Sequence, residues 1–451
     1  MPNEGAVSAE DQEFSDALRS ALHALWQLPI SGLQNPSSDP NYRALLAALR
    51  TRCVGADTFG GTLAISNALR QLGLPCGLAT HQQHLSPDAE QAVVMLEAAL
   101  AARSIDRMHL IPLDLADHLP ELAFGNARVS WLTEGELSTL VDLPRLERTH
   151  SEDVFDLAKF SQFQWLVIRE SVPLQYTSAG RHISSFHFDT LADLGRIEPH
   201  SGKFPEPVES ALFWLALAPW EDWVDMPEID WRGFRAPWVY TIDHDMFAST
   251  KRPPSPDSLN WAEKIFQDAQ GHIHEELRPL VLGLSDVAGP GLTDHLEQRQ
   301  VAMERVSGSA LFEPPVVHFF VRAFLSDGMD EFLAHMLAIE AAIGLRMDHK
   351  RKMSTGINGF DHLSATSRIV ARISALLGDT LAGQYKELFD IRSEFIHGRP
   401  MAGISTGERV MARILARKVV DALVNSIQTQ QQINRGDYLD ALLIAGAGST
   451  S

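Results

Sequence analysis

The segment LAGQYKELFDIRSEFIHG, residues 381–398, decides how the C-terminal part of this chain is interpreted. Gly398 suits the left-handed conformation that often ends a helix, and Pro400 cannot continue one. The spacing therefore predicts a helix over 381–397. Its apolar residues recur with the period of one helix face, which predicts a buried stripe made of Leu381, Tyr385, Leu388, Phe389, Phe395 and Ile396.

Arg392 falls within this predicted apolar stripe. Each residue turns a helix by about 100°, which places Arg392 in line with Tyr385 and Leu388. A buried guanidinium needs a carboxylate, a phosphate or an interface as its partner, because an unpaired buried charge is costly. Glu340 is a candidate, since it is the only charged residue between Glu331 and Arg346 on another apolar helix.

His397 closes the same helix. A helix C-terminus favours a protonated imidazole, and an imidazole that titrates near neutral pH suits general acid–base catalysis. Side chains five positions apart point about 140° apart on a straight helix. Arg392 and His397 of one chain would therefore meet only at a distorted helix end. A composite site from two chains related by a twofold axis avoids this difficulty.

The box Arg-x4-His in FDIRSEFIHG, with its flanking helices, resembles the Apea-like branch of the HEPN domain family. The resemblance covers about residues 314–428. It rests on an acidic residue in an early apolar helix (Glu340), an arginine before a hydrophobic helix end (Arg372 in ARISALLG) and the RSxxxHG box. Ser393 follows Arg392, as in the Apea-like branch, where many HEPN domains have Asn, Asp or His.

The resemblance implies a helical domain that often dimerises around the Arg/His motif. Many members look like metal-independent endoribonucleases of toxin–antitoxin, abortive-infection and antiviral defence systems. It assigns charge stabilisation to Arg392 and proton transfer to His397, with Glu340, Arg372 and Ser393 in support. RNA is then the expected substrate, a homodimer the expected assembly, and no cofactor or metal is expected.

Two other functions stay open. The domain could be a non-catalytic module for dimerisation or RNA binding. It could also be the modified partner of a nucleotidyltransferase, which is disfavoured because no tyrosine stands next to the motif. Arg409, Arg413 and Arg417 recur every four residues and could form an RNA-binding ridge. Alternatively, they form a solvated face paired with acidic residues of the N-terminal part.

Apolar and polar patterning predicts an α+β protein with five consecutive parts. These are an N-terminal helical region (1–104), a mixed α/β body (105–255), a helical connector (256–313), the HEPN-type domain (314–435) and a tail (436–451). Strands are predicted at 108–115, 127–133, 164–172, 211–217 and 238–242, and a connector helix at 260–284. Six tryptophans between 214 and 261 are interpreted as packing residues, because no basic residues interleave with most of them.

Charge and composition limit the function further. The net charge is −20, yet residues 330–435 carry 14 Lys and Arg against 11 Asp and Glu, so only this part suits a polyanion. The acidic remainder is hypothesised to sense a trigger and to restrain the basic domain. Two cysteines, no apolar run that spans a bilayer and no secretory signal predict a cytoplasmic protein without a membrane span. The sequence contains no nucleotide-hydrolase, dinucleotide-binding or α/β-hydrolase motif.

Overall fold

The chain forms two compact units in the computed structural model, and each unit is built from non-contiguous segments. Unit 1 comprises Met1–Ile111, Trp131–Arg196 and Trp238–Asn260, and unit 2 comprises Pro112–Ser130, Ile197–Pro237 and Trp261–Ser451. The five consecutive parts predicted from the sequence therefore differ from the compact units. The structure describes residues 9–30, 38–150, 155–178, 180–183, 204–224, 232–267, 270–312, 315–349, 360, 362–398, 403–430 and 432–449.

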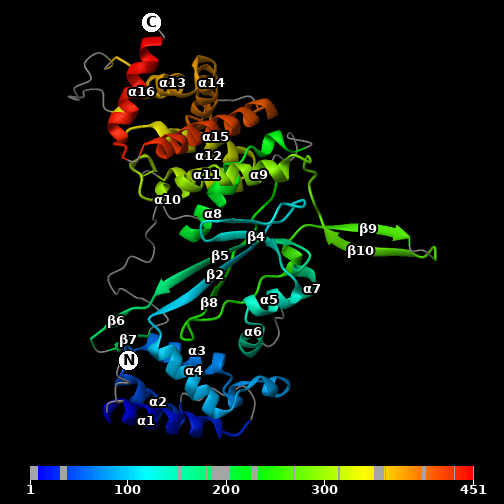
Figure 1. Ribbon diagram of the computed structural model, residues 1–451, viewed down its shortest axis with the longest axis vertical. Coiled ribbons are helices and arrows are strands. Elements are labelled where there is room, and N and C mark those ends of the chain that lie inside the picture. The colour runs from blue at the N-terminus through cyan, green and yellow to red at the C-terminus, as the bar shows by residue number, and fades with distance from the viewer. Residues whose placement is uncertain are drawn as a thin grey trace, which may run out of the picture. The chain divides into compact units, whose positions relative to one another are not determined.

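Four helices build the N-terminal core of unit 1, as the sequence predicts. Their buried leucines, alanines and isoleucines form one apolar cluster, which also contains Tyr42 and both cysteines. Side-chain caps fix three of the helix starts, at Asp39, Thr58 and Asp88. The helices are α1 (Ala9–Trp26), α2 (Pro40–Arg50), α3 (Phe59–Leu72) and α4 (Ala89–Ala101) (Figure 1).

Three strands of unit 1 are neighbours in one sheet, in the order β5-β2-β8. β2 (Ser104–Pro112) pairs antiparallel with β8 (Tyr240–Asp243) and lies beside β5 (Gln164–Pro173). All three lie where the sequence predicts strands. Smaller elements accompany them: the helices α5 (Glu134–Leu140), α6 (Leu143–Thr149) and α7 (Leu157–Phe160), and the short strands β1 (Cys53–Val54), β6 (Tyr176–Thr177) and β7 (Gly180–His182).

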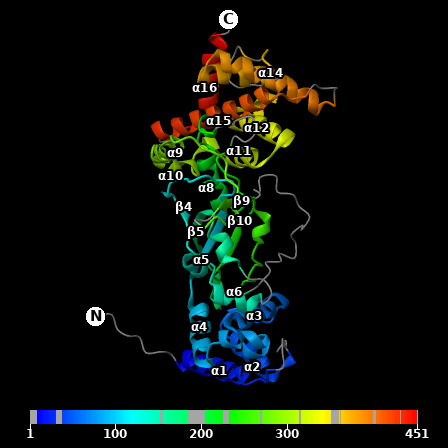
Figure 2. The same cartoon turned by 90° about the vertical axis from the view of Figure 1, so that its right-hand side faces the viewer.

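Unit 2 is mainly helical, and its C-terminal helices form the bundle that the sequence predicts. Within it α12 packs against α11 and α15, and α13 packs against α14 and α16 (Figure 1; Figure 2). The bounds are α9 (Ala288–Glu297), α10 (Gln300–Val306), α11 (Val316–Leu325), α12 (Gly328–Ile343), α13 (Ala365–Leu377), α14 (Asp379–Ile396), α15 (Thr406–Thr429) and α16 (Arg435–Ser449).

Unit 2 also contains a helix and two hairpins that precede the bundle. Strand β3 (Leu122–Phe124) pairs antiparallel with β4 (Ala127–Trp131), and β9 (Trp261–Gln267) pairs antiparallel with β10 (Ile273–Pro279). Helix α8 (Glu206–Ala216) packs against α11. The molecule combines helices and sheets, so the predicted α+β class is confirmed.

Three predictions about single segments are wrong. Residues 211–217 lie mostly in helix α8, because an apolar run buried on all sides carries no period that separates a strand from a helix. Residues 260–284 contain the β9–β10 hairpin instead of a connector helix. The tail 436–451 belongs to the bundle, since helix α16 packs against α13.

Three tryptophans of unit 2 pack in its interior, whereas Trp261 on β9 is half-buried. Trp214, Trp220 and Trp223 are at most 8% exposed, and the last two meet edge to face. The interpretation as packing residues is confirmed for these three, while Trp231 lies outside the described residues. In the described part of the chain, no helix has the length and apolar character needed to cross a membrane.

Candidate functional site

Helix α14 carries the Arg-x4-His motif and ends where the sequence predicts. The backbone N–H of His397 donates to the carbonyl of Ser393 at 3.1 Å, and Gly398 takes a left-handed φ of 63°. Tyr385 is buried, as expected for the apolar stripe. Phe395 and Ile396 are 42% and 52% exposed, so the predicted burial of the last helical turn is wrong.

Arg392 pairs with Glu340, the partner that the sequence suggests. Its Nη2 lies 3.3 Å from Glu340 Oε2, and the two side chains are 18% and 24% exposed. The guanidinium also lies 5.7 Å from the centroid of the Phe389 ring. Burial raises the pKa of the Glu340 carboxyl, while Arg392 and then His349 lower it. The pair joins α12 to α14 at the centre of the candidate site.

Tyr385 belongs to the same cluster and is fully buried. Burial raises the pKa of its phenol, and the negative charge of Glu340 raises it further. The phenol oxygen, Glu340 Oε1 and Arg392 Nε are buried and have no hydrogen-bond partner among the described residues. Buried polar atoms without partners are costly, and three such atoms belong to this cluster.

Arg372, the supporting arginine of the resemblance, makes a separate ion pair that is wholly buried. Its guanidinium donates to both carboxylate oxygens of Asp348, at 2.5 and 3.1 Å, and to the carbonyls of Ile343 and Leu439, each at 3.0 Å. Asp348 lies in the short 3-10 helix η7 (Arg346–His349), which follows α12. Arg372 therefore holds η7 against the bundle and does not itself reach solvent.

A pocket of about 340 Å³ opens beside the Arg392–Glu340 pair. Three elements besides α12 and α14 contribute to its wall: the turn after α12, η7 and the first half of α13. The predicted residues Glu340 and Arg392 thus border the same hollow. The lining residues are Glu340, Gly344, Leu345, Arg346, Asp348, His349, Ala365, Thr366, Ile369, Phe389 and Arg392.

His397 is exposed at the C-terminus of α14 and is not part of the pocket lining. It follows Arg392 by five residues, a rise of about 7.5 Å and a turn of about 140° on a regular helix. Ser393 is half-buried, and its carbonyl accepts the hydrogen bond that ends the helix. The structure thus brings Glu340 and Arg392 together and leaves His397 on the outside of the same helix.

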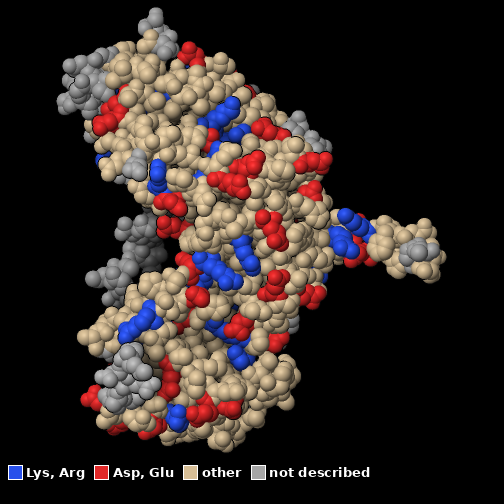
Figure 3. Space-filling view, in the orientation of Figure 1, with Lys and Arg blue, Asp and Glu red and all other residues tan. Residues whose placement is uncertain are grey.

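The three arginines Arg409, Arg413 and Arg417 do not form an exposed basic ridge in this structure, because each is paired with a glutamate. Arg409 and Arg413 pair with the buried carboxylate of Glu331 at 2.7 and 3.1 Å, and Arg417 lies 3.5 Å from Glu221. The arginines form one row on α15, but the row packs against neighbouring elements. On the face drawn in Figure 3, basic and acidic side chains of the described residues lie interspersed.

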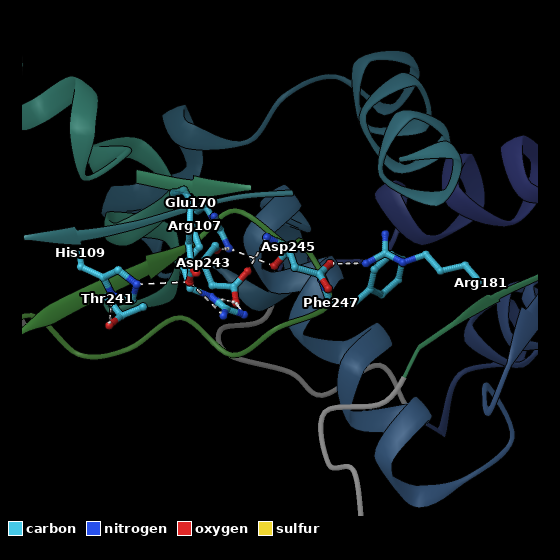
Figure 4. A network of polar contacts seen from close by, with 9 residues as sticks. Arg107, His109, Glu170, Arg181, Thr241, Asp243, Asp245 and Phe247 are labelled. Atoms are coloured by element: carbon cyan, nitrogen blue, oxygen red, sulfur yellow. Dashed lines mark hydrogen bonds and ion pairs between the residues drawn. The ribbon is translucent and has the colours of Figure 1, made fainter. Parts of the chain in front are cut away.

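Unit 1 contains a polar network that the sequence reasoning missed (Figure 4). Arg107 on β2 donates to Asp243 on β8 at 2.8 Å and to Glu170 on β5 at 3.3 Å. The ring of the fully buried His109 lies between Glu170 and Thr241, at 3.3 and 3.0 Å. Polar residues alternate in β2 and β8, and alternate residues share a face of a strand. The predicted strand bounds leave out Arg107 and Asp243, so this alternation was missed.

This network has the features of a structural element. Burial lowers the pKa of the His109 imidazole, while Glu170 raises it. The hollow beside Thr241 and Asp243 has a volume of about 10 Å³, close to the space that a single water molecule needs. The network pairs polar side chains across three strands, and the hollow at Thr241 and Asp243 is too small for a substrate.

Comparison with known proteins gives no further assignment. No protein-family model matches the chain, and no curated protein or solved structure matches it either.

Proposed function

We propose that this protein is a metal-independent endoribonuclease of the HEPN type, which acts as a homodimer in a defence or toxin system. The observation that carries the proposal is the Arg392–Glu340 pair beside a pocket, on a helix that ends in an exposed histidine. The ribose 2′-hydroxyl loses its proton to His397 and bonds to the neighbouring phosphorus, while the P–O5′ bond breaks and the departing 5′-oxygen takes a proton from solvent. Arg392 stabilises the negative charge that develops on the phosphate.

The exposed end of α14 supports a site that is shared between two copies. Phe395 and Ile396 expose apolar surface directly before His397. A twofold axis through this surface would bury both side chains against their symmetry mates and would bring His397 of one copy toward Arg392 of the other. This arrangement removes the conflict between the five-residue spacing and the need for both groups at one phosphate.

The test is RNA cleavage by the purified full chain in the presence of EDTA, with the products examined for 2′,3′-cyclic phosphate ends. We expect His397→Ala and Arg392→Ala each to lower the rate by at least about 100-fold, the usual contribution of general acid–base or charge-stabilising groups. His81→Ala and Arg322→Ala replace exposed residues elsewhere and should leave the rate unchanged.

Mixing the two inactive variants tests the shared site. Random exchange makes half of the dimers mixed, and each mixed dimer has one complete site of two, so about a quarter of the wild-type activity should return. A site within one chain would give no recovery. If the folded wild-type chain cleaves no RNA when purified and also causes no RNA cleavage in an expressing host that is exposed to phage, the nuclease proposal is wrong. The alternative of a non-catalytic dimerisation or RNA-binding module then takes its place.

The same proposal includes a sensing or restraining role for the acidic part of the chain. Residues 1–329 hold most of the negative charge that gives the chain its net −20. Expression of the full chain in a growing host addresses restraint. A restrained enzyme leaves growth unaffected until a trigger is present, whereas constitutive toxicity that His397→Ala abolishes would show that restraint is absent.

A further inference from the structure

The pocket beside Arg392 combines an apolar wall with a polar rim. Ile369 and Phe389 supply the apolar side, and Thr366 adds a hydroxyl from α13. The volume of about 340 Å³ lies at the small end of the range of ligand pockets. An apolar and aromatic wall of this kind packs against the flat face of any nucleobase, so the pocket suits a flat ring that carries a polar group.

The charges around the pocket favour an anion. Asp348 is neutralised by Arg372 at 2.5 Å and faces Arg368 at 3.7 Å, and Glu340 is paired with Arg392. Asp440 lies 3.9 Å from Arg372 and is the third carboxylate of the group. Both carboxylates that line the pocket, Glu340 and Asp348, are therefore paired with arginines, which leaves the positive charge of Arg346 in excess among the described lining residues.

This excess charge lies at the rim, on η7. Arg346 and His349 are exposed lining residues, and Arg346 has no ion pair among the described residues. The backbone that carries them is fixed, because Asp348 accepts from the N–H of Leu345 at 2.8 Å and is held by Arg372. Fixing the backbone of a binding segment lowers the entropy lost when a ligand binds.

We propose that this pocket binds one nucleotide of the RNA chain. Arg346 and His349 contact its phosphate, and its base lies against Ile369 and Phe389 with Thr366 at the edge. This inference rests on the proposed function, since it names how the same site holds its substrate. It adds Arg346, His349 and Thr366 as binding residues outside the Arg-x4-His motif.

The test is calorimetric titration of the full chain with 5′-AMP, with adenosine and with inorganic phosphate. We expect AMP to bind at least about tenfold more tightly than either fragment, because a charge-assisted contact and a packed base contribute together. Arg346→Ala should weaken AMP binding about tenfold and leave adenosine binding unchanged. Arg322→Ala, an exposed arginine of α11, is the matched control and should change neither.

Cleavage kinetics separate this inference from the proposed function. Arg346→Ala should raise KM about tenfold and leave kcat near the wild-type value, because the residue binds the substrate without touching the reacting atoms. If AMP binding depends on Arg346 but the chain has no nuclease activity, the proposal of a nucleotide-binding pocket is supported and the proposal of an endoribonuclease is refuted. RNA cleavage together with an unchanged AMP affinity in Arg346→Ala, or with no AMP binding, would overturn the pocket.

Discussion

Replacing Arg372 by Met should be among the most destabilising single changes in unit 2. The substitution removes the guanidinium but keeps an apolar chain of similar length, so packing changes little. Asp348, whose side chain is 4% exposed, would lose its partner at 2.5 Å and keep only Arg368 at 3.7 Å. The carbonyls of Ile343 and Leu439 would also lose a donor.

Removing one member of a buried ion pair costs about 3–5 kcal/mol, because the remaining charge stays buried without compensation. We expect Arg372→Met to lower the free energy of unfolding of unit 2 by this amount. Urea unfolding of the full chain, followed by far-UV circular dichroism, measures the change. Arg322→Met, which removes an exposed arginine, should cost less than about 0.5 kcal/mol.

The double variant Arg372→Met, Asp348→Asn sharpens this test. If the cost comes from an uncompensated Asp348, neutralising that residue should return about 1–3 kcal/mol of the loss. A loss below about 1 kcal/mol for Arg372→Met, or a double variant less stable than the single one, would refute the view that Arg372 holds η7 through Asp348.

Two further outcomes follow from the packing of unit 2. Gly446→Ala should destabilise the chain by about 1–3 kcal/mol, because its new Cβ would clash with the backbone carbonyl of Ala371. Gly448→Ala is the control in thermal melts, since a Cβ at that position meets no atom within 4 Å. Equal melting temperatures for the two would contradict this helix contact. Burial and the charge of Arg413 lower the pKa of His335 to about 3, below its value near 6.5 in the unfolded chain. The unfolded state therefore binds the proton first, and stability falls by about 1.4 kcal/mol per pH unit as pH drops from 6.5 toward 3. Urea titrations at pH 6.5 and 5.0 measure this loss of stability, and His335→Gln should remove the part that His335 contributes. A variant with the same pH dependence as the wild type would contradict the assignment to His335.

Local periodicity accounts for what could be predicted of the bundle and the site. Helix α14, its end at Gly398 and the capping box of Ser405 and Glu408 depend on residues close in sequence, which sequence patterns record. The Arg392–Glu340 pair was predictable for a different reason. Each is a charged residue on an otherwise apolar face, so two such faces that pack together favour their pairing.

The remaining features depend on contacts that no local pattern records. Asp348 lies in a short turn without periodicity, so nothing in the sequence marks it as the partner of Arg372. Arginines spaced by four residues give the same sequence pattern whether they face water or a buried carboxylate. In this structure Arg409 and Arg413 pair with the buried carboxylate of Glu331. The β9–β10 hairpin has mixed polar and apolar residues that fit a helix as well as a strand.

The alternation of the two units along the chain has a consequence for protein synthesis. Unit 1 begins with residues 1–111 but is complete only when residue 260 has been translated. The interval between the synthesis of residues 111 and 260 is about 7–30 s at 5–20 residues per second. Unit 2 begins at Pro112 and is complete only with the C-terminal helix. We therefore expect nascent chains to expose apolar surface of two incomplete cores on the ribosome at once, until translation supplies the missing segments.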